Sequence, residues 1–289
     1  MSIKSIKEFE YFAPQKIDEV LELLGKYGTE AKVIAGGTDL IPKMKAQIIS
    51  PKYIISLKNV EEIKYLDFDI ENGLQFGACV PIRKVENFGP VRELFPALYE
   101  GAHCIASTQI RNAGTLVGNI CNAVPSADSA PGMLVLEAVL HISSIRGNRD
   151  VKIREFFTGV CKTVLEPDEL VTGVSIMTPK KNSKNMYSAF TVRRALDLAM
   201  VGSAASINVE DGICKEARIA LGAVAITPKR AYNAEKILVS HKLTDELIDE
   251  AAYVASEEDC TPITDMRATR EYRKELVRVL TRNVIKACI

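Results

Sequence analysis

One stretch of sequence decides how this chain is interpreted: Val33-Ile34-Ala35-Gly36-Gly37-Thr38-Asp39-Leu40. An apolar strand runs directly into two glycines, which are followed by a hydroxyl and a carboxylate. Because glycine has no Cβ, backbone N–H groups can turn toward one point and an anion can approach closely. The stretch predicts either a phosphate cradle, to which Thr38 adds a hydroxyl, or an ordinary tight turn after a strand. It is neither a dinucleotide fingerprint nor a Walker loop, because GxGxxG and Gly-Lys-Ser/Thr are both missing.

A second segment of similar character is Gln109-Ile110-Arg111-Asn112-Ala113-Gly114-Thr115-Leu116-Val117-Gly118-Asn119-Ile120. It lies in a small, polar, aperiodic region from Ser107 to Pro131, for which we expect a long functional loop. The alternative is a structural loop whose Asn and Asp side chains bond their own backbone. Asp128 has two candidate roles here, as the cap of a helix starting near Pro131 or as an acceptor for cofactor hydroxyls.

The remaining first half of the chain predicts short strands and helices. Apolar residues at the helical period indicate a helix over 17–24, ended by Gly25 and Gly28. Apolar runs predict strands at 32–35 and 53–57. Residues 65–70 and 74–79 flank Asn72-Gly73, a strong hairpin signal because both residues tolerate positive φ. Pro81 and Pro96 suit helix starts.

The second half has a different pattern. Strands predicted at 199–209 and 216–224 flank Asp211-Gly212, a second hairpin signal. Helices follow, one capped by Thr244 and one by Thr269, the latter with an apolar stripe of Leu276, Val279, Leu280 and Val284. Strands followed by helices, without βαβ alternation, predict an α+β fold. The domain boundary is expected at 179–183, which gives domains over 1–179 and 183–289.

Composition excludes several classes of function. The 289 residues are 47% apolar, enough for a packed core, and the formal net charge is 0, which argues against general nucleic-acid binding. We see no secretory signal and no membrane span. The seven cysteines are scattered, which disfavours disulfides and metal sites and predicts a cytoplasmic protein.

Catalytic side chains are also missing from the sequence pattern. The three histidines, His103, His141 and His241, are isolated from obvious partners and are predicted to be structural. No nucleophile elbow, HExxH or paired-carboxylate motif occurs. A phosphate cradle without catalytic or metal-ligating residues indicates either a binding protein or the host of a redox cofactor that supplies the chemistry.

Five motifs follow one another in a fixed order: Ala35-Gly36-Gly37-Thr38-Asp39-Leu40, Gln109-Ile110-Arg111-Asn112, Gly118-Asn119-Ile120-Cys121-Asn122, Ser126-Ala127-Asp128-Ser129-Ala130 and Arg194-Ala195-Leu196-Asp197-Leu198-Ala199. Together they resemble the FAD-binding subunit of the xanthine dehydrogenase family of molybdenum hydroxylases, in particular the separate FAD subunit of bacterial members. The resemblance runs from about Phe9 to Val284. It implies a two-subdomain FAD-binding fold of the covalent-flavin, vanillyl-alcohol-oxidase type, with subdomains at about 1–58 and 59–179. A C-terminal domain with a small antiparallel sheet and helices follows.

The resemblance also implies positions for the cofactor. The pyrophosphate of FAD is wrapped by Lys32, Val33, Ile34, Ala35, Gly36, Gly37, Thr38, Asp39 and Leu40. Further contacts come from Gly114, Thr115, Leu116, Val117, Gly118, Asn119 and Asp128. Leu170 lies near the cofactor, and Ile105 and Leu198 face the two sides of the isoalloxazine.

Two residues depart from the family pattern. Val117 stands where the family commonly has a glycine, and its Cβ either crowds the cofactor or points away. Thr191 stands where the family often has a lysine, and a lost cation near the flavin lowers its reduction potential.

The family implies a partnership. A large subunit carries a molybdenum pterin and a small subunit carries two 2Fe–2S clusters, in a dimer of heterotrimers. FAD in this chain receives electrons from the clusters and passes them to NAD⁺ or another acceptor. The FAD is expected to be non-covalent, since no His or Cys stands at an attachment motif. Two alternatives remain: a self-sufficient flavin oxidoreductase of the related fold, and a binding module that has lost FAD.

Overall fold

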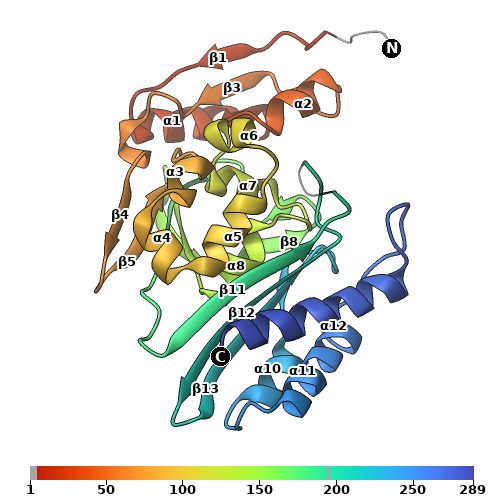
Figure 1. Cartoon of the computed structure of the whole chain (residues 1–289). Coiled ribbons are helices and arrows are strands. Elements are labelled where there is room, and N and C mark those ends of the chain that lie inside the picture. The colour runs from red at the N-terminus through yellow and green to blue at the C-terminus, as the bar shows by residue number, and fades with distance from the viewer. Residues whose placement is uncertain (1–4, 194–195) are drawn as a thin grey trace.

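The computed structural model describes residues 5–193 and 196–289, so Arg194 and Ala195 of the fifth motif lie outside the described residues. Three sheets follow one another along the chain, with helices packed between and around them (Figure 1). A short hairpin forms a fourth, two-stranded sheet. The α+β fold class predicted from the sequence is confirmed.

The first sheet is parallel, in the order β1-β3-β2. Its elements are β1 (Glu10–Phe12), α1 (Ile17–Tyr27), the 3₁₀ helix η1 (Gly28–Glu30), β2 (Ala31–Ile34), α2 (Leu40–Lys45) and β3 (Tyr53–Ser56). The predicted end of the first helix at Gly25 is wrong, because α1 continues to Tyr27 and ends at Gly28, whose φ is +50°. Gly25 instead gives room for packing: a Cβ there would lie 2.9 Å from Ile145 Cδ1.

The second sheet is antiparallel, in the order β4-β5-β10-β6-β7. Its strands are β4 (Leu66–Asp69), β5 (Gly73–Gly77), β6 (Val139–Ser144), β7 (Gly147–Lys152) and β10 (Leu170–Ile176), and the 3₁₀ helix η2 (Glu61–Ile63) precedes it. The predicted first hairpin is confirmed, but its turn is longer than two residues. Only Gly73 has a positive φ, while the Asp69 carboxylate accepts from the N–H groups of Glu71 and Asn72.

Helices connect the two halves of this sheet. They are α3 (Ile82–Glu86), α4 (Gly89–Leu94), α5 (Pro96–Cys104), α6 (Thr108–Ala113), α7 (Leu116–Asn122), α8 (Ser129–Val135) and α9 (Ile153–Phe156), and the small hairpin is β8 (Phe157–Gly159) with β9 (Lys162–Thr163). The predicted loop from Ser107 to Pro131 is therefore wrong, since it holds α6, α7 and the start of α8. Ser107 and Thr115 cap α6 and α7 with their side chains. Helices of six or seven residues are too short to show an apolar period.

The third sheet is antiparallel, in the order β11-β12-β13-β14. It consists of β11 (Ser183–Phe190), β12 (Val201–Glu210), β13 (Ile213–Gly222) and β14 (Lys229–Arg230), followed by α10 (Tyr232–Leu238), α11 (Asp245–Glu257) and α12 (Arg270–Ala287). Asp211 and Gly212 both have positive φ, as the predicted turn requires. Thr244 and Thr269 cap their helices as predicted. The predicted stripe on α12 is partly wrong, because Val279 is 50% exposed and Val277 is buried in its place.

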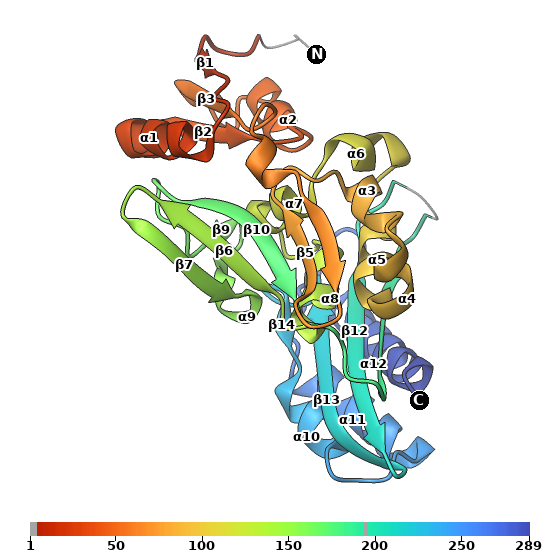
Figure 2. The same ribbon diagram turned by 90° about the vertical axis from the view of Figure 1, so that its left-hand side faces the viewer.

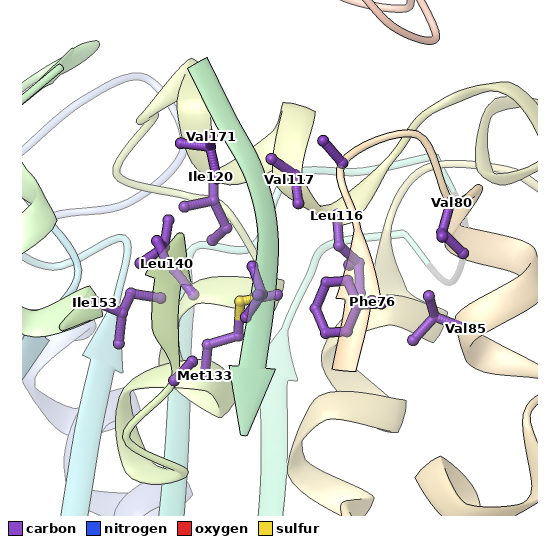
Figure 3. Close-up of a cluster of buried hydrophobic side chains, with 14 of the residues drawn as sticks. Phe76, Val80, Val85, Leu116, Val117, Ile120, Met133, Leu140, Ile153 and Val171 are labelled. Carbon is purple, nitrogen blue, oxygen red and sulfur yellow. The ribbon is translucent and has the colours of Figure 1, made fainter. Parts of the chain in front are cut away.

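The third sheet is covered on both faces. Helices α10 and α12 pack on one face, and α5 and α8 of the preceding domain pack on the other (Figures 1 and 2). Neighbouring residues of β12 accordingly enter different cores, with Ala204 in the first hydrophobic cluster and Ala205 in the second. In the first cluster, Phe76, Val117 and Met133 lie around the strand that carries Val171 (Figure 3). Burial on both faces thus joins the two halves of the chain.

Candidate functional site

The first glycine-rich segment is the connection from β2 to α2. The Ile34 carbonyl accepts from Leu57 N–H at 2.9 Å, which ends the pairing of β2 with β3, and the chain then turns outward. Gly37 has a φ of +69°, a conformation that side chains strongly disfavour. Its carbonyl accepts from Ile41 N–H at 3.0 Å in the first turn of α2. The two glycines therefore allow a sharp turn between strand and helix.

The second segment is the connection from α6 to α7. Gly114 N–H donates to the Ile110 carbonyl at 2.7 Å, and the Gly114 carbonyl accepts from Ile82 N–H at 2.9 Å. The Thr115 hydroxyl accepts from Gly118 N–H at 3.0 Å and so caps α7. These bonds fix the backbone of the second segment between two helices.

The structure brings the two segments into direct contact. A Cβ on Gly36 would lie only 2.0 Å from the Ala113 carbonyl oxygen, and a Cβ on Gly114 would lie 3.2 Å from Thr38 Oγ1. Glycine at position 36 is thus required by the close approach of another backbone. We call the surface formed by Gly36, Gly37, Thr38, Ala113 and Gly114 the glycine cradle. The two predicted glycine-rich segments, about 80 residues apart in sequence, form one surface.

The glycine cradle offers unused hydrogen-bond donors. Within the described residues, the N–H groups of Gly36, Gly37 and Thr38 donate to no protein acceptor. Lys43 of α2 donates to the Asn122 side chain of α7, which ties the two segments together and adds a positive charge. Free N–H groups, a hydroxyl and a nearby ammonium are the groups that bind a phosphate.

Asp128 lies at the other side of α7, at the start of α8. Its side chain makes no capping hydrogen bond, so the predicted capping role is wrong. The Oδ1 atom instead accepts from the Tyr187 hydroxyl of β11 at 2.7 Å. Burial raises the pKa of Asp128 to about 6, and the Tyr187 hydrogen bond partly opposes this rise. No local sequence signal identifies this partner, because 59 residues separate the two.

The three apolar positions assigned to the cofactor differ in exposure. Ile105 is 8% exposed at the end of α5, and Leu170 is 6% exposed at the start of β10. Leu198 is 56% exposed in the connection between β11 and β12. An exposed leucine in a connection can cover a bound ring, whereas the two buried residues form part of the protein wall.

A cluster of charged side chains around the buried Glu86 was not predicted from the sequence. Glu86 of α3 has a side chain that is 1% exposed, and it pairs with Arg83, His103 and Arg111. Burial alone raises the pKa of Glu86. The hydrogen bonds from His103 and Arg83 and the charge of Arg111 lower it by more, so the pKa of Glu86 lies below its ordinary value. Arg111 also donates to the Ile105 carbonyl at 2.9 Å. The arginine of the second motif thus fixes the backbone of Ile105.

The expectation that the histidines lack partners is also wrong. His103 lies 2.7 Å from Glu86, and His141 lies 2.8 Å from Asp150 and 3.1 Å from Ser175. His241 contacts the Val239 carbonyl. Packing of α3 against α5 brings Glu86 to His103, and pairing of β6 with β7 and β10 brings Asp150 and Ser175 to His141, whereas the partner of His241 lies only two residues away.

The other predicted site residues surround the glycine cradle. Lys32, Asp39 and Gly118 are exposed, whereas Val33, Ile34, Ala35, Leu40 and Asn119 are partly buried and Thr115 and Leu116 are buried. Val117 is 4% exposed and its side chain lies in the hydrophobic core, so its Cβ points away from the surface (Figure 3). Thr191 donates to the Arg193 carbonyl at 2.7 Å.

The described residues contain neither a candidate metal cluster nor a helix able to span a membrane. Over 5–193 and 196–289 there is no group of three or more His, Cys, Asp or Glu side chains arranged to hold a metal ion. Burial raises the pKa of Cys104 and of Cys121 to about 12, which keeps both as thiols. None of the helices in those ranges is long and apolar enough to span a membrane.

The residues present fit FAD. A pyrophosphate needs donors at a surface that lacks side chains, and the glycine cradle provides them. A hydroxylated chain needs acceptors, and Asp128 is one. An aromatic ring system needs apolar faces, for which Ile105, Leu170 and Leu198 are candidates. Bound there, FAD would supply one- and two-electron redox chemistry that no side chain of the site provides.

Comparison with known proteins agrees with this fit. Residues 7–179 match the family described as the FAD binding domain in molybdopterin dehydrogenase. Residues 186–288 match the CO dehydrogenase flavoprotein C-terminal domain. Both matches together span nearly the whole chain.

Individual relatives and solved structures are similar over most of their length. The chain is 32% identical to the glyceraldehyde dehydrogenase medium chain of Sulfolobus acidocaldarius, covering 96% of this chain and 98% of that one. It is 32% identical to a putative xanthine dehydrogenase FAD-binding subunit of Escherichia coli, covering 90% and 89%. A carbon monoxide dehydrogenase structure from Hydrogenophaga pseudoflava superposes with a TM-score of 0.94 at 29% identity, covering 99% and 98%. This chain therefore belongs to the family of FAD-binding subunits of molybdenum hydroxylases, a family of oxidoreductase subunits.

Proposed function

We propose that the chain is the FAD-carrying electron-transfer subunit of a molybdenum hydroxylase complex. The observation that carries the proposal is the contact between the two glycine-rich segments. At this contact a Cβ on Gly36 would have no room, and within the described residues the N–H groups of Gly36, Gly37 and Thr38 donate to no protein acceptor. The pyrophosphate of a non-covalent FAD lies on that surface.

The proposal assigns a role to each predicted site residue. The segment 32–40 wraps the pyrophosphate, and 114–119 supplies further backbone and hydroxyl contacts. Asp128 accepts from hydroxyls of the cofactor. Ile105 and Leu198 face the isoalloxazine, and Leu170 forms part of the wall near it. The domains extend over 1–179, with subdomains at about 1–58 and 59–179, and over 183–289.

The complex supplies the remaining steps. A large subunit with a molybdenum pterin hydroxylates the substrate, and a small subunit with 2Fe–2S clusters delivers the electrons to this chain. NAD⁺ is the proposed acceptor, and the complex is a cytoplasmic dimer of heterotrimers. The names of several relatives, which are medium chains or FAD subunits of dehydrogenases, support this arrangement. The substrates in those names differ, so we assign none to this chain.

An absorbance spectrum of the purified chain tests the proposal. We expect the visible absorbance bands of an oxidised flavin, and release of the flavin by acid. Flavin that stays with the acid precipitate would indicate a covalent cofactor and contradict the proposal. Absence of flavin, together with failure to bind added FAD, would indicate a binding module that has lost the cofactor.

A further inference from the structure

A buried hydrogen bond joins the cofactor-binding domain to the C-terminal sheet. Asp128 precedes α8 and is 9% exposed, and Tyr187 lies on β11 and is 3% exposed. The Tyr187 hydroxyl donates to Asp128 Oδ1 at 2.7 Å. Within the described residues, Asp128 Oδ2 has no protein donor. One carboxylate oxygen is thus held by the C-terminal sheet and the other remains available to a ligand.

Two glycines make room for this pair. A Cβ on Gly202 of β12 would lie 2.6 Å from the Tyr187 hydroxyl. A Cβ on Gly101 of α5 would lie 2.7 Å from the Asp128 carbonyl oxygen. Any side chain at either position would displace one member of the pair. The arrangement therefore depends on small residues in two separate elements, one on each side of the contact.

The surroundings of the pair carry few charges. The side chain that faces Asp128 from α5 is Cys104, whose pKa burial and the Asp128 charge raise to about 12, so it stays neutral. Helix α7 has no charged residue. Glu100 and Arg111 are also nearby, and their charges respectively raise and lower the pKa of Cys104. Arg218 of β13 donates to the far end of α8, and Arg230 of β14 pairs with Glu235. Tyr187 is therefore the donor that stabilises the ionised carboxyl directly.

We infer that Tyr187 is a positioning residue for the cofactor: its hydroxyl orients Asp128 and keeps it ionised, so that Oδ2 can accept from a hydroxyl of FAD. The inference rests on the proposed function for the identity of the ligand. In this arrangement, FAD affinity depends on how the C-terminal sheet packs against α8, although Tyr187 itself does not touch FAD. An ionised acceptor binds a hydroxyl more strongly than a neutral one does.

The pH dependence follows from the sign of the pKa shift. Burial raises the pKa of Asp128 to about 6, and the Tyr187 bond lowers it. Affinity of the wild type for FAD should therefore fall as the pH drops through about 6. Removing the hydroxyl in Tyr187→Phe raises the pKa of Asp128 further. The loss of affinity then begins at a higher pH.

FAD titrations followed by flavin fluorescence, from pH 5.5 to pH 9, test the inference. For Tyr187→Phe we expect affinity about 10-fold below wild type at pH 7 and within about threefold at pH 9. Tyr253→Phe is the matched control, because Tyr253 is 53% exposed on α11, and should bind as the wild type does. Asp128→Asn should bind FAD weakly, with an affinity that does not change with pH in this range. The double variant Asp128→Asn, Tyr187→Phe should likewise show no pH dependence of FAD affinity.

Two results would overturn the inference. One is wild-type affinity of Tyr187→Phe at every pH, and the other is a uniform loss at every pH, which indicates a structural role alone. If Tyr187→Phe fails to fold, the pH dependence of FAD affinity in Asp128→Asn tests the inference instead. A dependence like that of the wild type would exclude Asp128 as the titrating acceptor and so overturn the inference. A wild type that binds no FAD at any pH contradicts the proposed function itself, and the inference with it.

Discussion

The glycine cradle and the interior of the C-terminal domain are built in opposite ways. The cradle is formed by backbone whose N–H groups at Gly36, Gly37 and Thr38 have no protein acceptor in the described part of the chain, and glycine there allows two segments to touch. The C-terminal domain is held by buried charged side chains such as Arg273, which is 2% exposed, and the Arg230–Glu235 pair. The difference fits the proposed function, in which the first region receives the cofactor and the second gives the C-terminal domain its stability.

The strongest test of the fixed region is Arg273→Met. Arg273 donates to the Met200 carbonyl at 2.6 Å and to Asp265 at 2.9 Å, and so joins α12 to the start of β12. Its removal leaves buried acceptors unpaired, and we expect a loss of about 3–5 kcal/mol in the free energy of unfolding. Urea unfolding of the chain measures this.

Arg270→Met is the matched control, because Arg270 is exposed on the same helix. Its effect should stay within about 0.5 kcal/mol. If both substitutions lower the free energy of unfolding by the same small amount, Arg273 does not hold the C-terminal domain together.

The next test concerns the boundary between core and cradle. Val117 departs from the family's glycine, yet its side chain lies in the core. Val117→Gly should therefore cost about 2–4 kcal/mol of stability, from lost apolar burial and lower helix propensity. FAD affinity of the folded variant should remain near that of the wild type. A clear gain in affinity would show that the valine crowds the cofactor.

A smaller effect is expected from Asp128→Asn on stability in the absence of FAD. Burial raises the pKa of this carboxyl above its ordinary 3.8, to about 6, so ionisation costs folding free energy as the pH rises through that window. The amide should stabilise the FAD-free chain by about 2 kcal/mol at pH 8. The gain should shrink as the pH falls below about 4, because the carboxyl is then mostly protonated in both the folded and the unfolded state. A loss of stability at pH 8 would contradict this account of the buried charge.

Features that depend only on neighbouring residues, such as turns and helix caps, can be predicted from the sequence. Asp211-Gly212 specifies its hairpin by positive φ, and Thr244 and Thr269 specify helix starts by side-chain caps. The glycines of the cradle can be predicted because two glycines directly after an apolar strand let backbone N–H groups turn toward one point, where an anion can approach. The two short helices α6 and α7 were not predicted, since the hydroxyl caps Ser107 and Thr115 without an apolar period are also typical of loops.

Long-range pairing was not predictable from one sequence. Glu86 meets Arg111 across 25 positions, and Asp128 meets Tyr187 across 59. Such contacts depend on how sheets and helices pack in three dimensions. A single sequence specifies the residue types at these positions but not which of them meet.

The most direct measurement of the central claim is an FAD titration of three proteins by flavin fluorescence. Gly36 and Gly37 are poor probes, because side chains there clash with Ala113 or strain a φ of +69°. Gly118 is exposed beside the cradle, and only the Thr115 hydroxyl lies within 4 Å of its added Cβ, at 2.9 Å. Gly89 has no atom within 4 Å of its added Cβ and serves as the control.

The account predicts one FAD per wild-type chain with a Kd of about 1 μM or less. Gly118→Ala should weaken binding by at least about 10-fold, roughly 1.4 kcal/mol, while Gly89→Ala binds as the wild type does. Thermal melting of both variants without FAD verifies that they are folded. Equal affinity of Gly118→Ala and the wild type, or no binding by the wild type, would contradict the placement of FAD at the glycine cradle.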